Sequence, residues 1–352
     1  MNGHEARRSR LVDSNVFAAG SVFVTNDPPS VRYLTGFSGS NGALVIDGDR
    51  YLLVTDGRYG QQAAQECPGI EIVIERDFVV ALSNVVGDRS VLLDDQMPMS
   101  LGTRLSASGI ATTPVANPIT ELRAIKDDHE VEQLRHACRI TAEALTGLAA
   151  ELRVGDREVD IARRLEELFG RMGADDRAFA SIVASGENSA IPHHRAGQRA
   201  LCEGDLLIID CGAMVAGYHA DMTRTFIVAA DPEPWQMEIH SVVHRAQEAA
   251  LQRLQPGVIA GEVDGSARTV IAEAGFAAGL LHGTGHGVGL RIHEAPMIIA
   301  NSEDQIFVGA VVTVEPGIYL PGRGGVRIED SVLVSHTPQV LTSMNRALTR
   351  VA

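Results

Sequence analysis

Two stretches of the chain share one pattern, and this pattern constrains the fold more than any other feature. Residues 204–212 read Gly-Asp-Leu-Leu-Ile-Ile-Asp-Cys-Gly, and residues 309–317 read Gly-Ala-Val-Val-Thr-Val-Glu-Pro-Gly. In both, one acid follows the first glycine by six positions, and the acids Asp210 and Glu315 are 105 positions apart (315 minus 210). Burying an acid at the end of an apolar strand costs free energy unless the acid is paired or binds a metal. The pattern therefore predicts a duplicated unit that carries acids to a buried site.

A second acid follows each stretch inside a strand-like run, Asp221 after the first and Glu329 after the second. Four acids in a repeated arrangement predict a symmetric carboxylate cluster and a two-metal site. Two simpler interpretations remain open at this point. Asp221 could be a turn residue or pair with Arg224, and Glu329 could form a salt bridge with Arg327.

The repeat extends into helical segments before each stretch. Apolar residues at helical spacing predict helices from about residue 127, over 157–172, over 234–254 and over 262–274. Leu-Arg-Val-Gly at 152–155 with Glu158 resembles Leu-Gln-Pro-Gly at 254–257 with Glu262, although the spacing from glycine to the following valine differs by two residues. The sequence after residue 120 therefore predicts two copies of helix, helix, strand and hairpin.

The first 120 residues predict a separate, smaller α/β domain. Residues 20–60 read as β-rich, with strands at 21–25, 42–46 and 51–55, and Asp47-Gly48 is a hairpin turn signal. A helix is expected over 58–66 and strands over 70–74 and 91–94. The predicted fold class is α/β (α+β), with domains at 1–120 and 121–352.

Charge and composition exclude several classes of function. The net charge of −15 disfavours binding to nucleic acid or to an anionic membrane, because like charges repel. No apolar run is long enough to predict a membrane span, and the polar first ten residues do not resemble a signal peptide. The four cysteines form no Cys-x-x-Cys pair, which fits reduced thiols. A cytoplasmic location is expected.

A segment rich in histidine and glycine runs from His282 to Glu294 and reads His-Gly-Thr-Gly-His-Gly-Val-Gly-Leu-Arg-Ile-His-Glu. Its glycines allow a close approach of the backbone to another group. The segment is neither a dinucleotide-binding fingerprint nor a His-Glu-x-x-His zinc motif. Its histidines predict ligand or proton-transfer roles. A second pair, His193-His194, lies in a polar loop and could also be simply solvated, and Cys211 is expected to be a buried thiol facing away from Asp210.

These motifs together resemble the pita-bread metallopeptidases, the fold shared by methionine aminopeptidase, aminopeptidase P, prolidase and creatinase. The matching strings lie in family order at 188–194, 209–212, 221–226, 282–289, 292–294, 314–319 and 325–330. The strings at 33–42 and 55–59 resemble the amino-terminal domain of the aminopeptidase P branch. Methionine aminopeptidase lacks that domain.

The resemblance implies hydrolysis of the Xaa-Pro bond at the N-terminus of short peptides by a hydroxide that bridges two metal ions. It implies five metal ligands, namely Asp210, Asp221, His286, Glu315 and Glu329. His193 and His293 would hydrogen-bond the substrate, Glu315 would also act as general base, and Arg327 would orient a ligand carboxylate. Because the ligands are mostly carboxylates, Mn²⁺ is expected, with Co²⁺ or Zn²⁺ as alternatives.

Two other functions remain open. An Xaa-Pro dipeptidase, or prolidase, would have to bind the carboxylate of the dipeptide, and Arg291 or Arg323 could do so. A catalytically inactive binding module is the other alternative, although such relatives lose metal ligands and this chain keeps them all. Short peptides with proline in second position are the expected partners, and the N-terminal domain is expected to support a homodimer.

Overall fold

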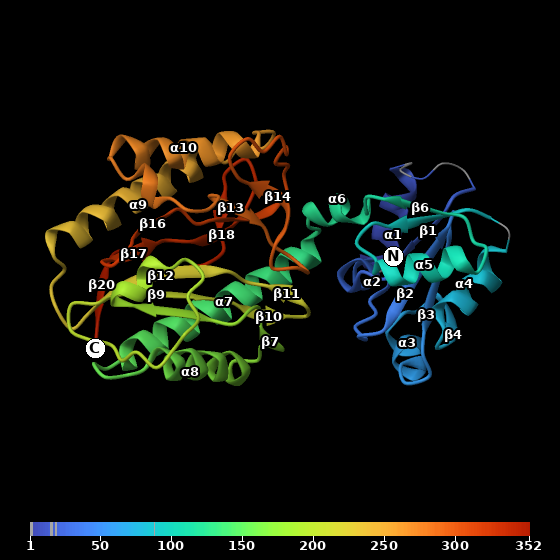
Figure 1. Ribbon diagram of the computed structural model, residues 1–352, viewed down its shortest axis with the longest axis horizontal. Helices are drawn as coiled ribbons and strands as arrows, with labels where there is room; N and C mark the ends of the chain where they lie inside the picture. Colours follow the sequence, from blue (N-terminus) through green and yellow to red (C-terminus); the bar gives the residue numbers. More distant parts are fainter. Residues whose placement is uncertain (1–2, 15–16, 18–19, 88) are drawn as a thin grey trace. The chain divides into compact units, whose positions relative to one another are not determined.

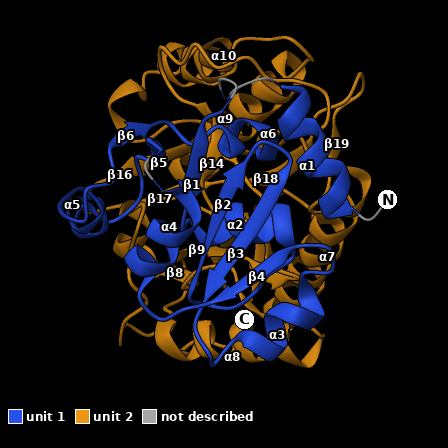
Figure 2. Cartoon of the chain, turned by 90° about the vertical axis from the view of Figure 1, so that its right-hand side faces the viewer, with its two compact units in different colours: residues 1–123 blue, residues 124–352 orange. Residues whose placement is uncertain are grey.

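The computed structural model describes residues 3–14, 17, 20–87 and 89–352. The chain forms two compact units, residues 1–123 and residues 124–352, which Figure 2 colours separately. The sequence placed the boundary at 120. Each unit has its own hydrophobic core.

Unit 1 contains a six-stranded sheet in the order β4-β3-β2-β1-β5-β6. β2 is antiparallel to β1 and β3, and the pairs β1–β5, β5–β6 and β3–β4 are parallel. Its strands are β1 (Val22–Thr25), β2 (Gly42–Asp47), β3 (Arg50–Thr55), β4 (Glu71–Ile74), β5 (Val91–Asp94) and β6 (Thr112–Val115). Its helices are α1 (Gly3–Asp13), α2 (Pro28–Thr35), α3 (Gly60–Glu66), α4 (Phe78–Val86) and α5 (Met99–Ala107), and α6 (Ile119–Ala124) ends it.

The predicted hairpin of unit 1 is confirmed, but among its helices the sequence predicted α3 and missed α1, α2, α4, α5 and α6. Asp47 pairs with Arg50 across the turn, and Gly48 has a φ of 64°, which glycine adopts without strain. The interpretation of residues 20–60 as β-rich was wrong over α2. Asp27 caps this helix by accepting from the Ser30 N–H, and Pro28 stands in its first turn. These start signals were present in the sequence.

Unit 2 carries the repeat. Its long helices are α7 (Asp128–Glu151), α8 (Glu158–Arg171), α9 (Pro234–Arg253) and α10 (Ala260–Glu273), with short 3₁₀ helices η1 (Gly186–Ala190) and η2 (Ala277–Gly279). The strands of the first half are β7 (Asp176–Arg177), β8 (Ile182–Ser185), β9 (Leu206–Cys211), β10 (Ala213–Val215), β11 (Tyr218–His219) and β12 (Met222–Val228). Those of the second half are β13 (Gly285–Gly287), β14 (Glu294–Ile298), β15 (Val311–Val314), β16 (Gly317–Leu320), β17 (Gly324–Arg327), β18 (Asp330–Leu333), β19 (Gln339–Val340) and β20 (Thr349–Val351).

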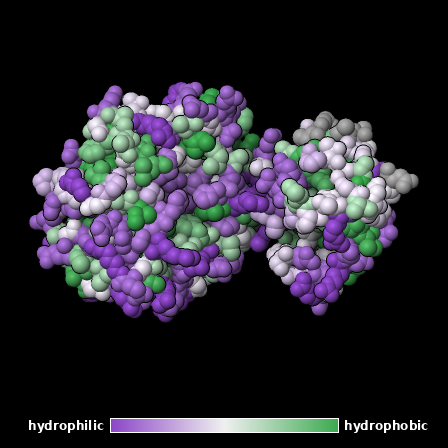
Figure 3. Space-filling view, in the orientation of Figure 1, coloured by the Kyte–Doolittle hydropathy of each residue, from purple (hydrophilic) through white to green (hydrophobic). Residues whose placement is uncertain are grey.

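The strands of the two halves form the middle of unit 2, with α7 and α8 on one side and α9 and α10 on the other (Figure 1). The sheet of the first half has the order β20-β12-β9-β8, and that of the second half is β14-β13-β15-β18-β19. This is the pita-bread arrangement expected from the sequence. Among the described residues, no helix combines the length and the apolar composition needed to cross a bilayer. Hydrophilic residues predominate on the face of this unit drawn in Figure 3.

Backbone hydrogen bonds follow the repeat residue by residue. The N–H of Gly204 donates to Val228 O and that of Gly309 to Val334 O; the return bonds, Val228 to Asp205 and Val334 to Ala310, also correspond. The first strands are therefore related by 105 residues (309 minus 204) and the second strands by 106 (334 minus 228). We call the segment from α7 to β12 the first copy and the segment from α9 to β18 the second copy.

These offsets correct two equivalences drawn from the sequence. The helices α8 and α10 begin 102 residues apart (260 minus 158), so Ala260 corresponds to Glu158, and Glu262 does not. Asp210 lies opposite Thr223 in the first copy, and Val314 opposite Asp330 in the second. By the 106-residue offset, Glu329 corresponds to Thr223. The second acids were expected at equivalent positions, and they lie two residues out of step.

Candidate metal centre

One cavity of about 860 Å³ in unit 2 collects the residues singled out by the sequence. Its lining comes from both copies, because β9 and β12 of the first copy meet the strands of the second. The predicted residues that line it are Asp210, Asp221, His286, Glu315, Glu329, His193 and His293. These predicted residues, which lie up to 136 positions apart in the chain (329 minus 193), thus surround one space.

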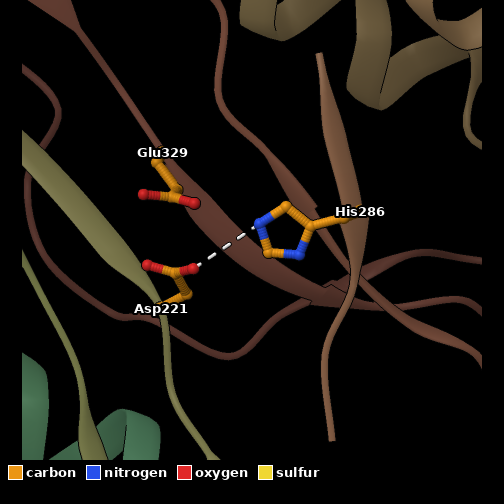
Figure 4. A group of neighbouring side chains, drawn as sticks. All are labelled: Asp221, His286 and Glu329. Atoms are coloured by element: carbon orange, nitrogen blue, oxygen red, sulfur yellow. Dashed lines mark ion pairs between the residues drawn. The ribbon is translucent and has the colours of Figure 1, made fainter. Parts of the chain in front are cut away.

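Three of these side chains point toward one another (Figure 4). The ligand atoms of Asp221, His286 and Glu329 all lie within 4.8 Å of one another, and all three residues are buried. His286 Nε2 lies 3.7 Å from Asp221 Oδ2 and 3.3 Å from Glu315 Oε1. His286 Nδ1 lies 3.0 Å from the Gly287 carbonyl oxygen, to which it donates, because a carbonyl oxygen can only accept. In a neutral ring, Nε2 then keeps its lone pair toward the acids.

Two polar side chains orient the acids. Arg327 Nη2 donates to Asp210 Oδ2 at 2.6 Å, and its Nε donates to Thr223 Oγ1 at 3.0 Å. Thr223 Oγ1 in turn donates to Glu329 Oε2 at 2.7 Å. Among the ion pairs that the described residues form, neither Arg327 with Glu329 nor Asp221 with Arg224 occurs. Arg327 pairs with Asp210, and Arg224 pairs with Asp330.

Crowding of buried carboxylates makes their ionised forms costly. Burial raises the pKa of Asp221 well above its ordinary value, and the charges of Glu329 and Asp210 raise it further. Burial and the charge of Glu315 likewise raise the pKa of Glu329. Burial also raises the pKa of Asp210 against the lowering effect of Arg327. A buried cluster of this kind is stable with its acids ionised only when cations neutralise them.

Glu315 behaves differently because His286 lies beside it. Burial alone would raise the pKa of Glu315, but its hydrogen bond with His286 and the positive charge of that ring lower the pKa to about 2. For His286, burial lowers the pKa, and the contact with Glu315 overcomes this and raises it. Without a metal, His286 therefore holds its proton more tightly than a free imidazole does. An imidazole must lose this proton to bind a metal.

The glycines of the histidine segment make room for neighbouring groups. A Cβ at Gly285 would lie 2.0 Å from Thr313 O, and one at Gly287 would lie 2.2 Å from Ala295 O. At Gly289 it would lie 2.2 Å from Glu294 Oε1. Side chains at these positions would separate β13 from its neighbours and displace His286. The close approach predicted for these glycines is thus confirmed, and the approaching groups are protein atoms.

Sequence reasoning missed several residues around the cavity. Tyr319 OH accepts from Arg327 Nη1 at 2.7 Å and lies 2.8 Å from His282 Nε2. Thr223 and the buried Glu158 were also overlooked. Only the repeat itself could have indicated Thr223, as the counterpart of Glu329. Cys211 is a buried free thiol, as expected.

The arginines suggested for binding a substrate carboxylate do not line the cavity. The guanidinium of Arg323 stacks over the ring of Trp235, 4.4 Å from its centroid, and Arg291 is not among the lining residues. Among the described residues, the arginines that line the cavity are Arg163, Arg177, Arg195 and Arg327. Three of these four come from the first copy, whereas Arg291 and Arg323 both belong to the second.

The fold and the buried cluster of acids and histidine define a metallopeptidase. Residues 132–336 match the model of Metallopeptidase family M24, and residues 7–125 match the Creatinase/Prolidase N-terminal domain. The chain belongs to metallopeptidase family M24, which confirms the family expected from the motifs. Membership implies the use of divalent metal ions.

Relatives and solved structures cover nearly the whole chain. The Xaa-Pro dipeptidase of Pyrococcus furiosus is 34% identical over 343 residues, which are 96% of this chain and 97% of the relative. The structure of the Xaa-Pro dipeptidase from Bacillus anthracis has a TM-score of 0.91 at 33% identity and covers 99% of both chains. That of the X-Pro aminopeptidase from Thermotoga maritima has a TM-score of 0.88 at 33% identity, covering 98% of this chain and 100% of that one.

Proposed function

We propose that the chain is a dinuclear-metal peptidase that hydrolyses the Xaa-Pro bond at the N-terminus of short peptides. The observation that carries the proposal is the convergence of three buried carboxylates, the partly exposed carboxylate of Glu315 and one buried histidine, from both copies, in a single cavity. Relatives named Xaa-Pro dipeptidase and X-Pro aminopeptidase, at 33–34% identity along nearly the full chain, support the choice of substrate.

The residues present suit two divalent cations. Asp210 Oδ1 is buried and has no hydrogen-bond partner among the described residues, although Oδ2 is held by Arg327. Four carboxylates match the charge of two divalent ions. Their oxygen-rich composition with one imidazole suits Mn²⁺, with Co²⁺ and Zn²⁺ as alternatives. The proposed ligands are Asp210, Asp221, His286, Glu315 and Glu329.

When bound, the two ions would supply a water of lowered pKa and positive charge near the scissile carbonyl. The side chains of the protein would transfer the proton, stabilise the carbonyl oxygen and orient the metal ligands. Glu315 would accept the proton of the attacking water and hold it for the leaving proline nitrogen. His193 and His293 line the same cavity, where their ring N–H groups would donate to the carbonyl oxygen as negative charge develops. Arg327 and Thr223 would hold Asp210 and Glu329 in place.

The choice between an aminopeptidase and a dipeptidase depends on the rest of the cavity. About 860 Å³ lies toward the upper end of small-ligand cavities, which span about 300–1,000 Å³. This leaves room for residues beyond proline and favours the aminopeptidase. A dipeptidase would have to bind a carboxylate directly after proline, and the arginines of the lining offer donors for that. Both activities therefore belong in the first assay.

The decisive experiment compares Gly-Pro with Gly-Pro-Gly after reconstitution of the metal-free protein with Mn²⁺, Co²⁺ or Zn²⁺. Cleavage of the tripeptide after glycine is expected, fastest with Mn²⁺. Exclusive cleavage of Gly-Pro would establish the dipeptidase instead. Cleavage of Gly-Ala-Gly at the same rate as Gly-Pro-Gly would refute the preference for proline. Metal-independent turnover would refute the proposed chemistry.

We also propose that the protein acts in the cytoplasm as a homodimer. Its four cysteines are free in the structure, three of them buried, which fits a reducing compartment. Sedimentation equilibrium measures the oligomeric state, and a monomer at all concentrations would refute the dimer.

A further inference from the structure

The Glu158 carboxylate is completely buried and lies at the start of α8. Its Oε1 accepts from Ser185 N at 2.8 Å, Ser185 Oγ at 2.7 Å and Asn188 Nδ2 at 3.0 Å. Its Oε2 accepts from His194 Nε2 at 2.8 Å and Gly197 N at 3.1 Å. The desolvation of this carboxylate would raise its pKa, but these hydrogen bonds together lower it. Glu158 is therefore held as a carboxylate by donors.

All five donors come from one segment, residues 185–197. This segment connects β8 to the wall of the cavity, and its residues 192–196 line the cavity. Its Pro192 carbonyl oxygen accepts from Arg327 Nη1 at 3.2 Å. The segment is thus fastened at Ser185, Asn188, His194 and Gly197 by Glu158, and His193 lies between two of these points.

Glu158 itself does not line the cavity, although its neighbours Val159 and Ala162 do. It also makes none of the contacts within the acid cluster. Its counterpart in the second copy, Ala260, cannot accept side-chain hydrogen bonds, so the repeat alone does not account for an acid here. Hydrogen bonds to a charged carboxylate are strong, and removing the carboxylate would leave buried donors unsatisfied.

We propose that Glu158 is a positioning residue, which fixes the segment 185–197 so that His193 faces the substrate. The inference rests on the proposed function, in which His193 donates to the scissile carbonyl. Displacement of a reacting group by about 1 Å can lower the rate by roughly a hundredfold. Loss of the Glu158 carboxylate therefore slows turnover without altering the metal ligands.

The test combines Glu158→Gln with His193→Ala in a double-mutant cycle on the peptide that the wild type cleaves. The glutamine amide keeps one acceptor and replaces the other with donors. We expect Glu158→Gln to lower kcat by roughly tenfold to a hundredfold, with KM changed less and the Mn²⁺ affinity unchanged by calorimetry. In the His193→Ala background, Glu158→Gln should change kcat by less than about twofold, because residues that act through one another are not additive.

Glu130→Gln is the matched control. Glu130 is equally buried in unit 2, caps α7 and accepts from Tyr218 OH at 3.1 Å. Its replacement should lower the melting temperature and leave kcat unchanged. If Glu158→Gln and His193→Ala instead multiply in their effects, or if Mn²⁺ affinity falls in step with kcat, Glu158 does not act through His193 and the inference is wrong.

Hydrogen exchange gives a readout that needs no activity. The Ser185 and Gly197 amides donate to Glu158, so peptides covering 185–197 should exchange faster in Glu158→Gln than in the wild type or Glu130→Gln. Unchanged exchange would overturn the inference. If the wild type cleaves no Xaa-Pro peptide but exchange rises as expected, the proposed function fails while the fastening of this segment by Glu158 stands.

Discussion

The two copies of the repeat in unit 2 share a backbone and differ in the chemistry placed on it. Thr225 Oγ1 donates to Arg327 O at 2.8 Å, and its counterpart Ser331 Oγ donates to Asp221 O, also at 2.8 Å. These bonds exchange equivalent positions of the two copies, as a local twofold axis requires. The scaffold is therefore symmetric at the centre of the site.

The cluster itself is not symmetric. Arg327 is the counterpart of Asp221, and Thr223 that of Glu329, by the 106-residue offset of the second strands. His286 corresponds to Ala184, since Ile182 lies opposite Asp210 and the Thr284 carbonyl accepts from the Glu315 N–H. The two copies thus contribute equivalent first acids, Asp210 and Glu315, but their second acids, Asp221 and Glu329, come from different positions of the same hairpin.

Because the two copies carry different side chains at equivalent positions, the equivalent acids Asp210 and Glu315 lie beside different basic side chains. Asp210 contacts Arg327, which stays charged at all physiological pH values. Glu315 contacts His286, which can lose its proton. One half of the site is therefore fixed in charge, whereas the other can exchange protons, which fits the proposed role of Glu315 in proton transfer.

The largest effect on turnover is expected at Glu329, whose equivalent position in the first copy is Thr223. Glu329→Ala should abolish metal-dependent turnover because it removes a proposed metal ligand. Thr223→Val should weaken Mn²⁺ binding by roughly tenfold to a hundredfold, because it removes only the hydroxyl that orients Glu329. Calorimetric titration and peptide hydrolysis measure both effects. Equal losses would show that the two positions share one role.

Breaking the ion pair between Arg224 and Asp330 should show how much the symmetric centre of unit 2 contributes to the stability of the fold. These counterparts lie 2.7 Å apart, and their side chains are 2% and 0% exposed. Arg224→Ala should lower the free energy of unfolding by about 3–5 kcal/mol, because it leaves a buried carboxylate without this partner. Urea denaturation measures the loss. The control Arg139→Ala breaks an exposed pair with Glu143, and a similar loss there would contradict the explanation.

Metal removal should destabilise the protein more strongly as the pH rises. The pKa values of Asp221, Glu329 and His286 are raised in the folded protein, so protonation stabilises the metal-free fold at low pH and this stability is lost as pH rises above about 4–6.5. The lowered pKa of Glu315 acts oppositely, but only between about pH 4.5 and 2.

Mn²⁺ at a hundred times its Kd should stabilise the protein by about 2.7 kcal/mol. At one fixed Mn²⁺ concentration, the gain in melting temperature upon adding the metal should increase from pH 5 to pH 8, because the metal competes with protons for the same ligands. Differential scanning calorimetry with and without chelator measures it. A gain independent of pH would show that the metal does not replace protons in this cluster.

The smallest effect concerns His240 in α9, whose counterpart in α7 is Cys138 by the 102-residue offset. Burial lowers the pKa of His240 to about 4. Its stabilising contribution is present above pH 6.5 and is lost as pH falls toward 4, by up to about 2 kcal/mol at pH 5. His240→Gln should flatten this part of the stability profile. His244→Gln, one turn along the helix, serves as the control and should not.

The sequence motifs predicted many of the secondary-structure elements and most of the residues of the candidate site. The hairpin in unit 1, the four long helices of unit 2 and the cavity residues from His193 to Glu329 were expected, because periodicity and glycine placement act locally. The two-residue shift between the second acids escaped notice, since Asp221 and Glu329 look equivalent in a string of letters. Helix α2 was missed although Asp27 and Pro28 signalled its start.

The sequence by itself determined the family, the duplication and the identity of the acids and histidines, because each depends on residue type and spacing along the chain. Only the tertiary structure decided which acid meets which cation, and that Glu158 fastens the segment bearing His193. These pairings depend on strand register and on burial. A change of two residues in register exchanges an arginine for an acid, and no local pattern specifies it.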